Sequence, residues 1–188
     1  SADGRHVAFI SNATNLVPGD LGGKNQVFVR DTASGQTRRV SVDAAGVAGS
    51  ADSERPSINS DGRYIAYSSK AANLTGGPAG VLLWDRETGN STRVDTGLAG
   101  AKPDGVSDSA SISDDGRYVA FRSFATNLVE GDANGVADVF VRDMLTGETR
   151  RVSVASDGTP ADKAAASPCV SGNGQFVGLG TDPHADLS

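Results

Sequence analysis

Apolar and polar residues alternate along this chain in short runs, and glycine-containing turns separate the runs. The segment after Gly62 reads RYIAYSS, and the segment after Gly116 reads RYVAFRS. Alternation with a period of two is typical of a strand with one buried face. No segment of any length shows the 3.6-residue period of an amphipathic helix. The pattern therefore predicts an all-β protein made of short strands joined by tight turns.

One sequence unit returns along the chain. Its most regular part is a turn followed by a strand, as in SADGRHVAF, NSDGRYIAY, SDDGRYVAF and the weaker SGNGQFVGL. The turn glycines are Gly4, Gly62, Gly116 and Gly174, so the spacings are 58, 54 and 58 residues. A second part repeats as QVFVRDTASGQTRRVSV and DVFVRDMLTGETRRVSV, with the divergent VLLWDRETGNSTRVDT between them. Self-similarity at such a period indicates a repeat architecture.

Each unit contains four strand signals. A short run precedes the turn glycine, a second run follows it, VFVRD or VLLWD comes third, and TRRVSV or STRVDT comes fourth. Gly-containing pairs between β-branched runs are hairpin signals. Four antiparallel strands per unit predict the blades of a β-propeller. A β-sandwich of duplicated hairpins is the structural alternative, but a sandwich does not require identical units in one register.

The repeated motif also carries a family resemblance. Asp-Gly-Arg-aromatic-Val/Ile-Ala-Phe/Tyr, followed by Asn-Leu, Val-Phe-Val-Arg-Asp and Thr-Gly, resembles the WD-like repeat of TolB-type propellers over nearly the whole chain. The resemblance implies that the run before the turn glycine is the innermost strand of each blade. The family includes periplasmic and secreted scaffolds and propellers attached to peptidases. It therefore implies a fold and an extracytoplasmic location, but no activity.

With that strand order, the chain is a single propeller segment of three to four blades. Residues 1–42 supply a first blade without its innermost strand, residues 56–96 and 109–154 form two complete blades, and residues 167–188 begin a fourth. An open arc leaves strand edges unpaired, which favours association. We expect that a longer chain completes the ring, or that copies associate, with the inner strand at Ser167 completing another copy's first blade.

Composition limits the expected partners. The 188-residue chain has a formal charge of −6 and no run of Lys and Arg. Nucleic acid is therefore not expected as a partner, because affinity for phosphates depends on basic residues. No apolar stretch approaches the ~20 residues that span a bilayer. The single cysteine, Cys169, excludes an intrachain disulfide, and its place in an apolar-alternating run predicts a small buried side chain.

No catalytic motif is present in the sequence. It contains no Gly-x-Ser-x-Gly turn, no phosphate-binding loop and no histidine cluster. We therefore predict no catalytic residues, and a scaffold that binds a protein or carbohydrate. The alternative is a propeller that gates the active site of a hydrolase or lyase carried by flanking sequence.

The loops of the unit differ in length between the two faces of the predicted propeller. The turns around the glycines are minimal, so the face that carries them, the turn face, offers little to a ligand. The loops between second and third strands, such as Asn12–Asn25 and Phe124–Ala137, and the loops between units lie on the opposite face, the loop face. Because binding residues usually lie on long loops of a rigid scaffold, we expect a ligand on the loop face.

Residues that depart from the repeat are the best binding candidates, because the scaffold does not require them. Trp84 stands where other units have Arg30 and Arg142. An exposed Trp would suit a sugar ring or a partner surface, whereas a buried one would fill space left by a shorter loop. Glu54 and Asp108 precede their inner strands. They are either an acidic mouth of the central channel, which attracts cations or basic peptides, or solvated loop carboxylates.

One loop suggests a metal site. GDANGVAD places Asp132, Asn134 and Asp138 as oxygen ligands, as in calcium loops, although the spacing departs from the EF-hand pattern. The first unit keeps only Asp20 of this set, and the middle unit keeps none. An Asp/Asn-stabilised turn is the alternative. Calcium is the only cofactor that the sequence suggests.

Two further sets of residues are expected to be structural. Alternating positions on the second and third strands should face the next blade: Val7, Phe9, Val27, Val29, Ile65, Tyr67, Val119, Phe121, Val139 and Val141. Invariant aspartates before the last turn and arginines of the fourth strand should pair between adjacent strands: Asp31, Asp85, Asp143, Arg39, Arg93 and Arg151.

Overall fold

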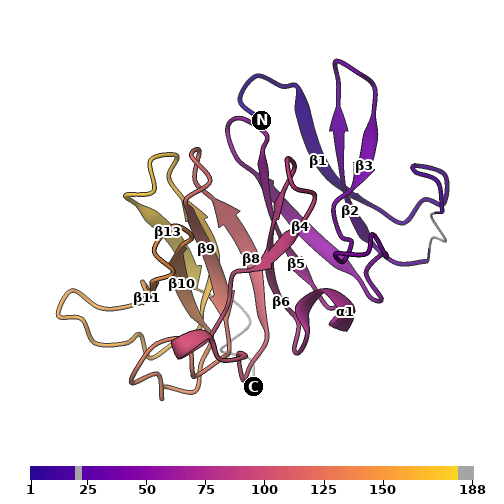
Figure 1. The fold of residues 1–188 in the computed structure, drawn as a ribbon. Coiled ribbons are helices and arrows are strands. Elements are labelled where there is room, and N and C mark those ends of the chain that lie inside the picture. Colours follow the sequence, from indigo (N-terminus) through magenta and orange to yellow (C-terminus); the bar gives the residue numbers. More distant parts are fainter. Residues whose placement is uncertain (20–22, 182–188) are drawn as a thin grey trace.

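The computed structural model describes residues 1–19 and 23–181, and its strands form four antiparallel sheets (Figure 1). Blade 1 contains β1 (His6–Ser11), β2 (Gln26–Asp31) and β3 (Thr37–Arg39). Blade 2 contains β4 (Ser53–Ile58), β5 (Tyr64–Ser69), β6 (Gly80–Asp85) and β7 (Ser91–Arg93). Blade 3 contains β8 (Ser107–Ile112), β9 (Tyr118–Ser123), β10 (Asp138–Asp143) and β11 (Thr149–Arg151). Blade 4 contains β12 (Ala165–Val170) and β13 (Val177–Thr181).

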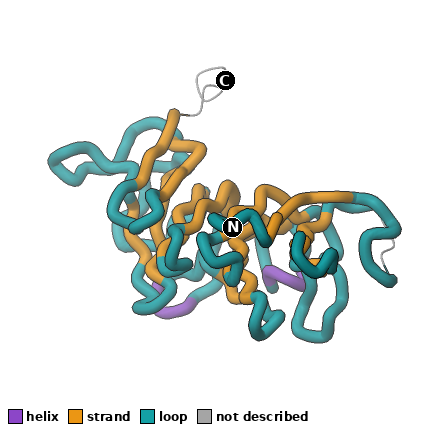
Figure 2. The backbone as a smooth tube through the Cα atoms, turned by 90° about the horizontal axis from the view of Figure 1, so that it is seen from above, coloured by secondary structure: helices purple, strands orange, loops and turns teal. Residues whose placement is uncertain are grey.

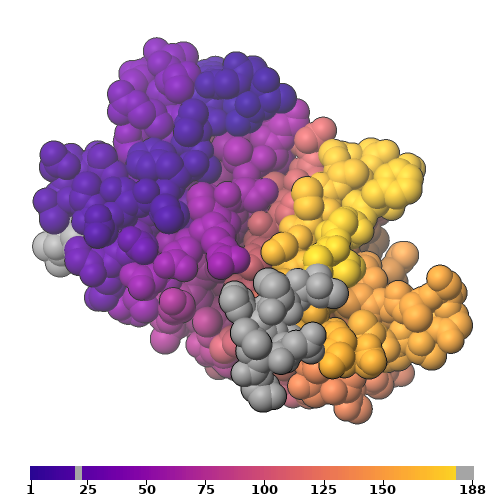
Figure 3. Space-filling view, turned by 180° about the vertical axis from the view of Figure 1, so that it is seen from behind, coloured from indigo at the N-terminus to yellow at the C-terminus, as the bar shows by residue number. Residues whose placement is uncertain are grey.

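The four sheets follow one another around an arc. Seen from above and from behind, blade 1 and blade 4 lie on opposite sides with blades 2 and 3 between them (Figures 2 and 3). In the described part of the chain, helix is limited to α1 (Ala72–Thr75) and the 3₁₀ turn η1 (Leu98–Gly100). Within the same residues, no helix has the length and apolar content needed to cross a membrane. The predicted all-β propeller blades are confirmed.

Neighbouring blades pack face to face through two apolar clusters. Between blades 1 and 2, Val27 and Val29 pack with Ile65, Tyr67 and Trp84. Val27 and Val29 therefore face the next blade, as predicted. The prediction for the second strands is wrong. Ile65 and Tyr67 face the preceding blade, as do Val119 and Phe121. In β1 it is Ala8 that packs against the cluster, so Val7 and Phe9 lie on the opposite face.

The second cluster joins blades 2 and 3. Ala66 and Leu83 of blade 2 pack with Val119 and Phe121 of blade 3. Successive residues of a strand point to opposite faces, and a central blade has a neighbour on each side. Both faces of β5 and β9 are therefore buried, including the alanines between the large residues: Ala66 and Ala120.

A repeated contact between a ring and a glycine closes each junction between blades. A Cβ added at Gly116 would lie 2.4 Å from the Tyr64 ring of the preceding blade, and one at Gly174 would lie 2.1 Å from Tyr118. His6 takes the same place against Gly62. These glycines also have positive φ, near 71° to 75°. Two requirements, the turn conformation and the close approach of a ring, thus select glycine at these positions.

The predicted Asp–Arg pairs exist with different partners. The aspartates before the last turn pair with the arginine that follows the turn glycine, as in Arg63–Asp85 and Arg117–Asp143, at 3.0 and 2.7 Å. The prediction that Arg93 and its equivalents hold these aspartates is wrong. The second and third strands of a blade are adjacent, and Tyr64 at the start of β5 pairs with Asp85 at the end of β6. Arg63 directly precedes Tyr64, so its guanidinium lies beside the Asp85 carboxylate.

The terminal sheets expose several apolar side chains. Val7 and Ile10 of β1 and Phe176 and Leu179 near and in β13 are exposed. Cys169 is also exposed, so the predicted burial of this thiol is wrong. In this chain β12 pairs with its own β13. The completion of another copy's first blade by β12 stays a prediction, which sedimentation at micromolar concentration would check.

Candidate functional site at the junction of blades 2 and 3

The innermost strands begin earlier than the sequence predicts, and a bulge interrupts each of them. Strands β4, β8 and β12 start two or three residues before the predicted positions, and their register shifts after Glu54, Asp108 and Ala166. The next residue has positive φ in every case: Arg55 at 53°, Ser109 at 57° and Ser167 at 51°. Left-handed backbone at non-glycine residues is uncommon, and bulges re-aim side chains. Glu54 and Asp108 therefore lie in strands and not in loops.

A pocket of about 470 Å³ lies at the loop-face end of these inner strands, between blades 2 and 3. Blade 2 contributes residues of β4, β5 and the following loops, and blade 3 contributes the start of β8. The lining residues are Asp52, Glu54, Arg55, Ser68, Ser69, Lys70, Ala79, Val106, Ser107 and Asp108. The structure thus brings Glu54 and Asp108, which are 54 residues apart, to one pocket.

Hydrogen bonds between the blades hold the wall of this pocket. Arg55 Nη1 donates to Ser109 Oγ at 2.7 Å, and Ser109 Oγ donates to Asp108 Oδ1 at 2.8 Å. The Ser109 backbone N–H donates to Ser68 Oγ at 3.0 Å. From blade 1, Asn25 Nδ2 donates to Glu54 Oε1 at 3.3 Å. Contacts from three blades therefore fix the side chains that line the pocket.

A small residue keeps the pocket open. Ser68 is the sixth residue after its turn glycine, where blade 1 has Ile10 and blade 3 has Arg122. In blade 3 the Arg122 guanidinium lies over the Phe124 ring at 4.9 Å. Serine removes most of that side-chain volume in blade 2, so the space between the two blades stays unfilled. This departure from the repeat was visible in the sequence, but the pocket that it opens was not.

The third predicted binding residue, Trp84, does not reach the surface. Only 1% of Trp84 is exposed, and it lies in the apolar cluster between blades 1 and 2. The Arg38 guanidinium of blade 1 covers the ring at 5.3 Å from its centroid. The buried alternative is therefore the correct one, because blade 1 packs on the face of β6 that carries Trp84. A ligand cannot contact this ring without separating the blades.

The predicted calcium ligands meet in blade 3, around an arginine. Arg151 Nη1 lies 3.0 Å from Asp132 Oδ1 and 3.4 Å from Asp138 Oδ2. Asn134 Nδ2 donates to Asp138 Oδ2 at 2.9 Å. Burial raises the pKa of Asp132, although Arg151 opposes the shift. The Arg151 guanidinium therefore occupies the place where the ion would bind. Calcium binding stays a prediction, and it requires Arg151 to move. Asp20, the equivalent of Asp132 in the first unit, lies outside the described residues.

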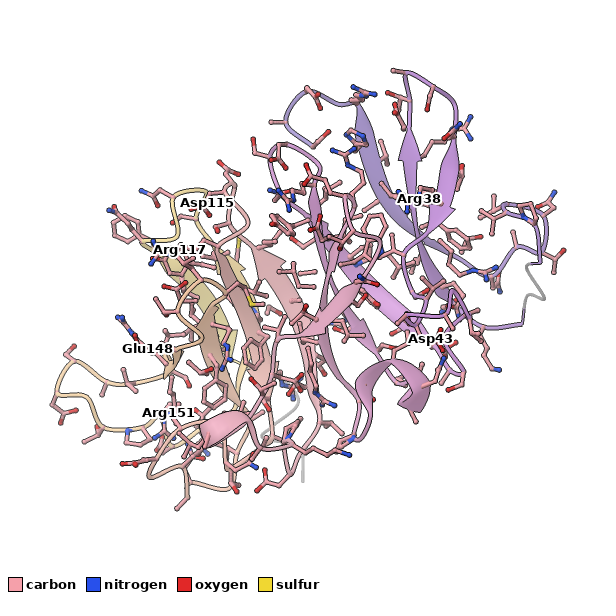
Figure 4. The ribbon with its side chains drawn as sticks, viewed as in Figure 1. Arg38, Asp43, Asp115, Arg117, Glu148 and Arg151 are labelled. Atoms are coloured by element: carbon pink, nitrogen blue, oxygen red, sulfur yellow. The ribbon has the colours of Figure 1, made fainter. Side chains whose placement is uncertain are left out.

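A groove on the turn face was not expected from the sequence. It has a volume of about 630 Å³ and lies between blades 2 and 3, with Leu83, Thr92 and Met144 in its lining. Asp115 and Arg117 also line it, at the opposite end of blade 3 from Arg151 (Figure 4). Thr92 stands where both other units have arginine: Arg38 and Arg150. That exchange was the signal that could have revealed the groove.

Comparison with known proteins identifies the fold. No protein-family model matches the sequence, and no curated protein matches it. Among solved structures, TolB from Acinetobacter baumannii aligns over 93% of this chain and 34% of its own, with 22% identity and a TM-score of 0.56. Oligogalacturonate lyase from Vibrio parahaemolyticus aligns over 100% and 45%, with 16% identity and a TM-score of 0.57. The tricorn protease aligns over 92% and 14%, with 14% identity and a TM-score of 0.55.

The chain spans less than half the length of each of these structures. They share a propeller, and the names of two of them describe different activities, a lyase and a protease. At identities of this size the likeness shows the fold alone. The chain has a TolB-like β-propeller fold.

Proposed function

We propose that this TolB-like propeller is a non-catalytic, extracytoplasmic binding scaffold, and that the inner pocket between blades 2 and 3 holds its protein or carbohydrate ligand. The pocket lies on the loop face, where the long loops of the unit converge. A concave site of a few hundred Å³ with several polar groups is the usual form of a ligand site. A rigid all-β scaffold with a pocket at the junction of two blades suits a binding function without catalysis.

One observation carries this proposal. The pocket exists because Ser68 is small where blades 1 and 3 have the large residues Ile10 and Arg122; the terminal strand β13 also has a small residue there, Gly180. Packing alone would favour a larger side chain at such a junction, since interiors are close-packed. A gap lined by Glu54 and Asp108 is therefore better explained by a ligand than by the scaffold.

The alternative role is a propeller that gates a lyase or hydrolase active site carried elsewhere. The names of two structural neighbours, a lyase and a protease, fit that role in general. No contact among the described residues favours it over binding. We therefore propose the scaffold.

The test uses the isotope-labelled chain and a defined panel of probes. Capped tripeptides of each charge class and neutral disaccharides are titrated while backbone amide signals are followed by NMR. At least one class should shift the amides of Ser68, Ser107 and Asp108 and saturate. Ser68→Ile, which fills the pocket with the side chain of blade 1, should abolish those shifts in a chain that stays folded, although it also removes the acceptor of the Ser109 backbone N–H.

Two outcomes would overturn the proposal. In one, no probe shifts the pocket amides. In the other, the shifts persist unchanged in Ser68→Ile, which would place the ligand outside the pocket.

A further inference from the structure

The carboxylates that line the inner pocket, Glu54 and Asp108, indicate the chemical class of its ligand. We propose that the group entering it is a lysine or arginine side chain of a partner protein, and that Glu54 is the principal counter-ion. This inference rests on the proposed function, because it names the ligand class of the same pocket.

Blade 3 carries a carboxylate and a cation at the equivalent cross-strand positions, although these two described side chains form no ion pair with each other and the Arg122 guanidinium lies over the Phe124 ring. In the register of β8 and β9, Asp108 lies directly opposite Arg122. In the register of β4 and β5, the equivalent carboxylate, Glu54, lies directly opposite Ser68. Directly opposed residues carry their side chains on the same face at close range, and opposite charges there are favourable. Blade 2 thus keeps the carboxylate and lacks the cross-strand cation that blade 3 has.

The cations that line the pocket do not replace the missing arginine. Among the described residues, Glu54 and Asp108 form no ion pair within 4.0 Å. The Arg55 guanidinium donates to the Ser109 hydroxyl. Glu54 accepts its hydrogen bond from the neutral amide of Asn25. A carboxylate at the wall of a pocket, without a cationic partner, is a ready counter-ion for a cation from outside.

The size and lining of the pocket select a side chain over a bare metal ion. A volume of about 470 Å³ is far larger than an ion needs. Within the described part of the chain, no group of three His, Cys, Asp or Glu could hold a metal. Ala79 and Val106 line the same space. They can cover the aliphatic stem of a lysine or arginine while the charged head reaches Glu54, since these side chains bury their stems along apolar surface.

The test compares two nearly isosteric probes that differ in charge. N-acetyl-arginine amide and the neutral N-acetyl-citrulline amide are titrated separately, and the amides of Ser68, Ser107 and Asp108 are followed by NMR. A single residue should bind with a millimolar Kd. We expect the arginine probe to bind at least about tenfold more tightly than the citrulline probe. Its affinity should fall as salt increases, because screening weakens exposed charge pairs.

Variants then identify the counter-ion. Glu54→Gln should weaken the arginine probe about tenfold, the factor that ~1.4 kcal/mol represents. Ser68→Arg, which restores the blade 3 residue, should remove binding by supplying the cation internally. Two matched controls carry the same charge changes on the turn face: Glu87→Gln, at an exposed carboxylate, and Thr92→Arg. Both should bind the arginine probe as the wild type does.

The outcomes separate this inference from the proposed function. Equal binding of both probes in the pocket, removed by Ser68→Ile, would overturn the cationic ligand and leave the binding scaffold in place. The same holds if a disaccharide binds there and the arginine probe does not. The proposed function and this inference would both be overturned if no probe shifted the pocket amides at concentrations up to about 50 mM, which is well above a millimolar Kd.

Discussion

Blades 2 and 3 have the same four-stranded topology, but the buried arginine of the fourth strand pairs with carboxylates from different positions in the two blades. In blade 2, Arg93 Nε lies 2.9 Å from Asp95 Oδ1. In blade 3, Arg151 lies between Asp132 and Asp138. Both arginines are largely buried, with 13% and 10% of their side chains exposed. A buried guanidinium without a carboxylate is costly, so blade 2 supplies one carboxylate and blade 3 supplies two.

The carboxylate has changed strands between the two blades. Asp138 and Ser153 of blade 3 correspond to Gly80 and Asp95 of blade 2. A Cβ at Gly80 would lie 2.5 Å from Arg93 Nη2 and 2.9 Å from Asp95 Oδ1. Glycine therefore makes room for the relocated pair. The exchange of these two positions is compensated, because a buried polar group is costly without a partner.

Other departures have no such compensation. Ser68 and Thr92 of blade 2 each replace an arginine of blade 3, and each leaves a pocket or groove between the blades. The lesson is that a compensated exchange preserves the scaffold. An exchange without compensation at the junction of two blades leaves a pocket or groove that a ligand can occupy.

The largest expected effect concerns the relocated carboxylate. Asp95→Ala leaves Arg93 buried without its partner and should lower the free energy of unfolding by about 3–5 kcal/mol. The double variant Gly80→Asp with Asp95→Ser copies the Asp138 and Ser153 positions of blade 3, without an equivalent of Asp132, and should recover part of that loss. Urea titrations measure both. A double variant no more stable than Asp95→Ala would contradict the exchange.

The apolar contacts of the same two blades give the next comparison. Phe121 in blade 3 and Tyr67 in blade 2 occupy one repeat position, and both are fully buried. Phe121→Ala should cost about 3–5 kcal/mol, since the ring also stacks on Phe140 at 5.8 Å. Tyr67→Phe removes only the hydroxyl contact to Ser91 and should cost about 1 kcal/mol. Denaturant titration measures both variants. A Phe121→Ala loss below about 1 kcal/mol would contradict the burial of this ring between blades 2 and 3.

The Arg63–Asp85 pair should make stability depend on pH. The hydrogen bond from Arg63 lowers the pKa of Asp85, and Arg117 does the same for the pKa of Asp143. A lowered folded-state pKa stabilises the protein above the unfolded value of about 3.9, and this contribution disappears as pH falls through the folded pKa. Asp85→Asn should cost about 1 kcal/mol or less at pH 7. Melting curves of variant and wild type should converge at lower pH, and a constant difference would exclude the carboxylate charge as its cause.

Closing the turn-face groove should have almost no effect on stability. Thr92→Arg gives blade 2 the residue that blades 1 and 3 already carry at this position. The free energy of unfolding should change by no more than about 0.5 kcal/mol. A large loss in thermal melting would show that blade 2 cannot accept its sister residue, and that the groove has a structural cause.

The smallest expected effect is a change in melting temperature on removal of calcium. It concerns blade 3 alone of these two blades, because blade 2 lacks the ligand set. If Asp132, Asn134 and Asp138 bind the ion, EDTA lowers the wild-type melting temperature. Asp132→Ala then removes that sensitivity. Identical melting curves with calcium and with EDTA would leave Arg151 as the only cation of this cluster.

The sequence by itself determined the elements and their order. The turn glycines, the alternating runs and their return every 54 to 58 residues predicted four-stranded blades, because these signals are local and each unit repeats them. Glu54 and Asp108 were singled out as departures from the repeat, but the sequence placed them before the inner strands, whereas they lie inside β4 and β8. What they line was not predictable.

Only the tertiary structure decided how the units meet. The burial of Trp84 depends on Arg38 and the face of blade 1, and the pocket beside Ser68 depends on β8 of blade 3. The bulge at Arg55 likewise leaves no signal in its own strand, where a positive φ is unusual for arginine. Each of these features is set by contacts between residues about one repeat apart, and a local pattern carries no information about which side of a strand the next sheet will cover.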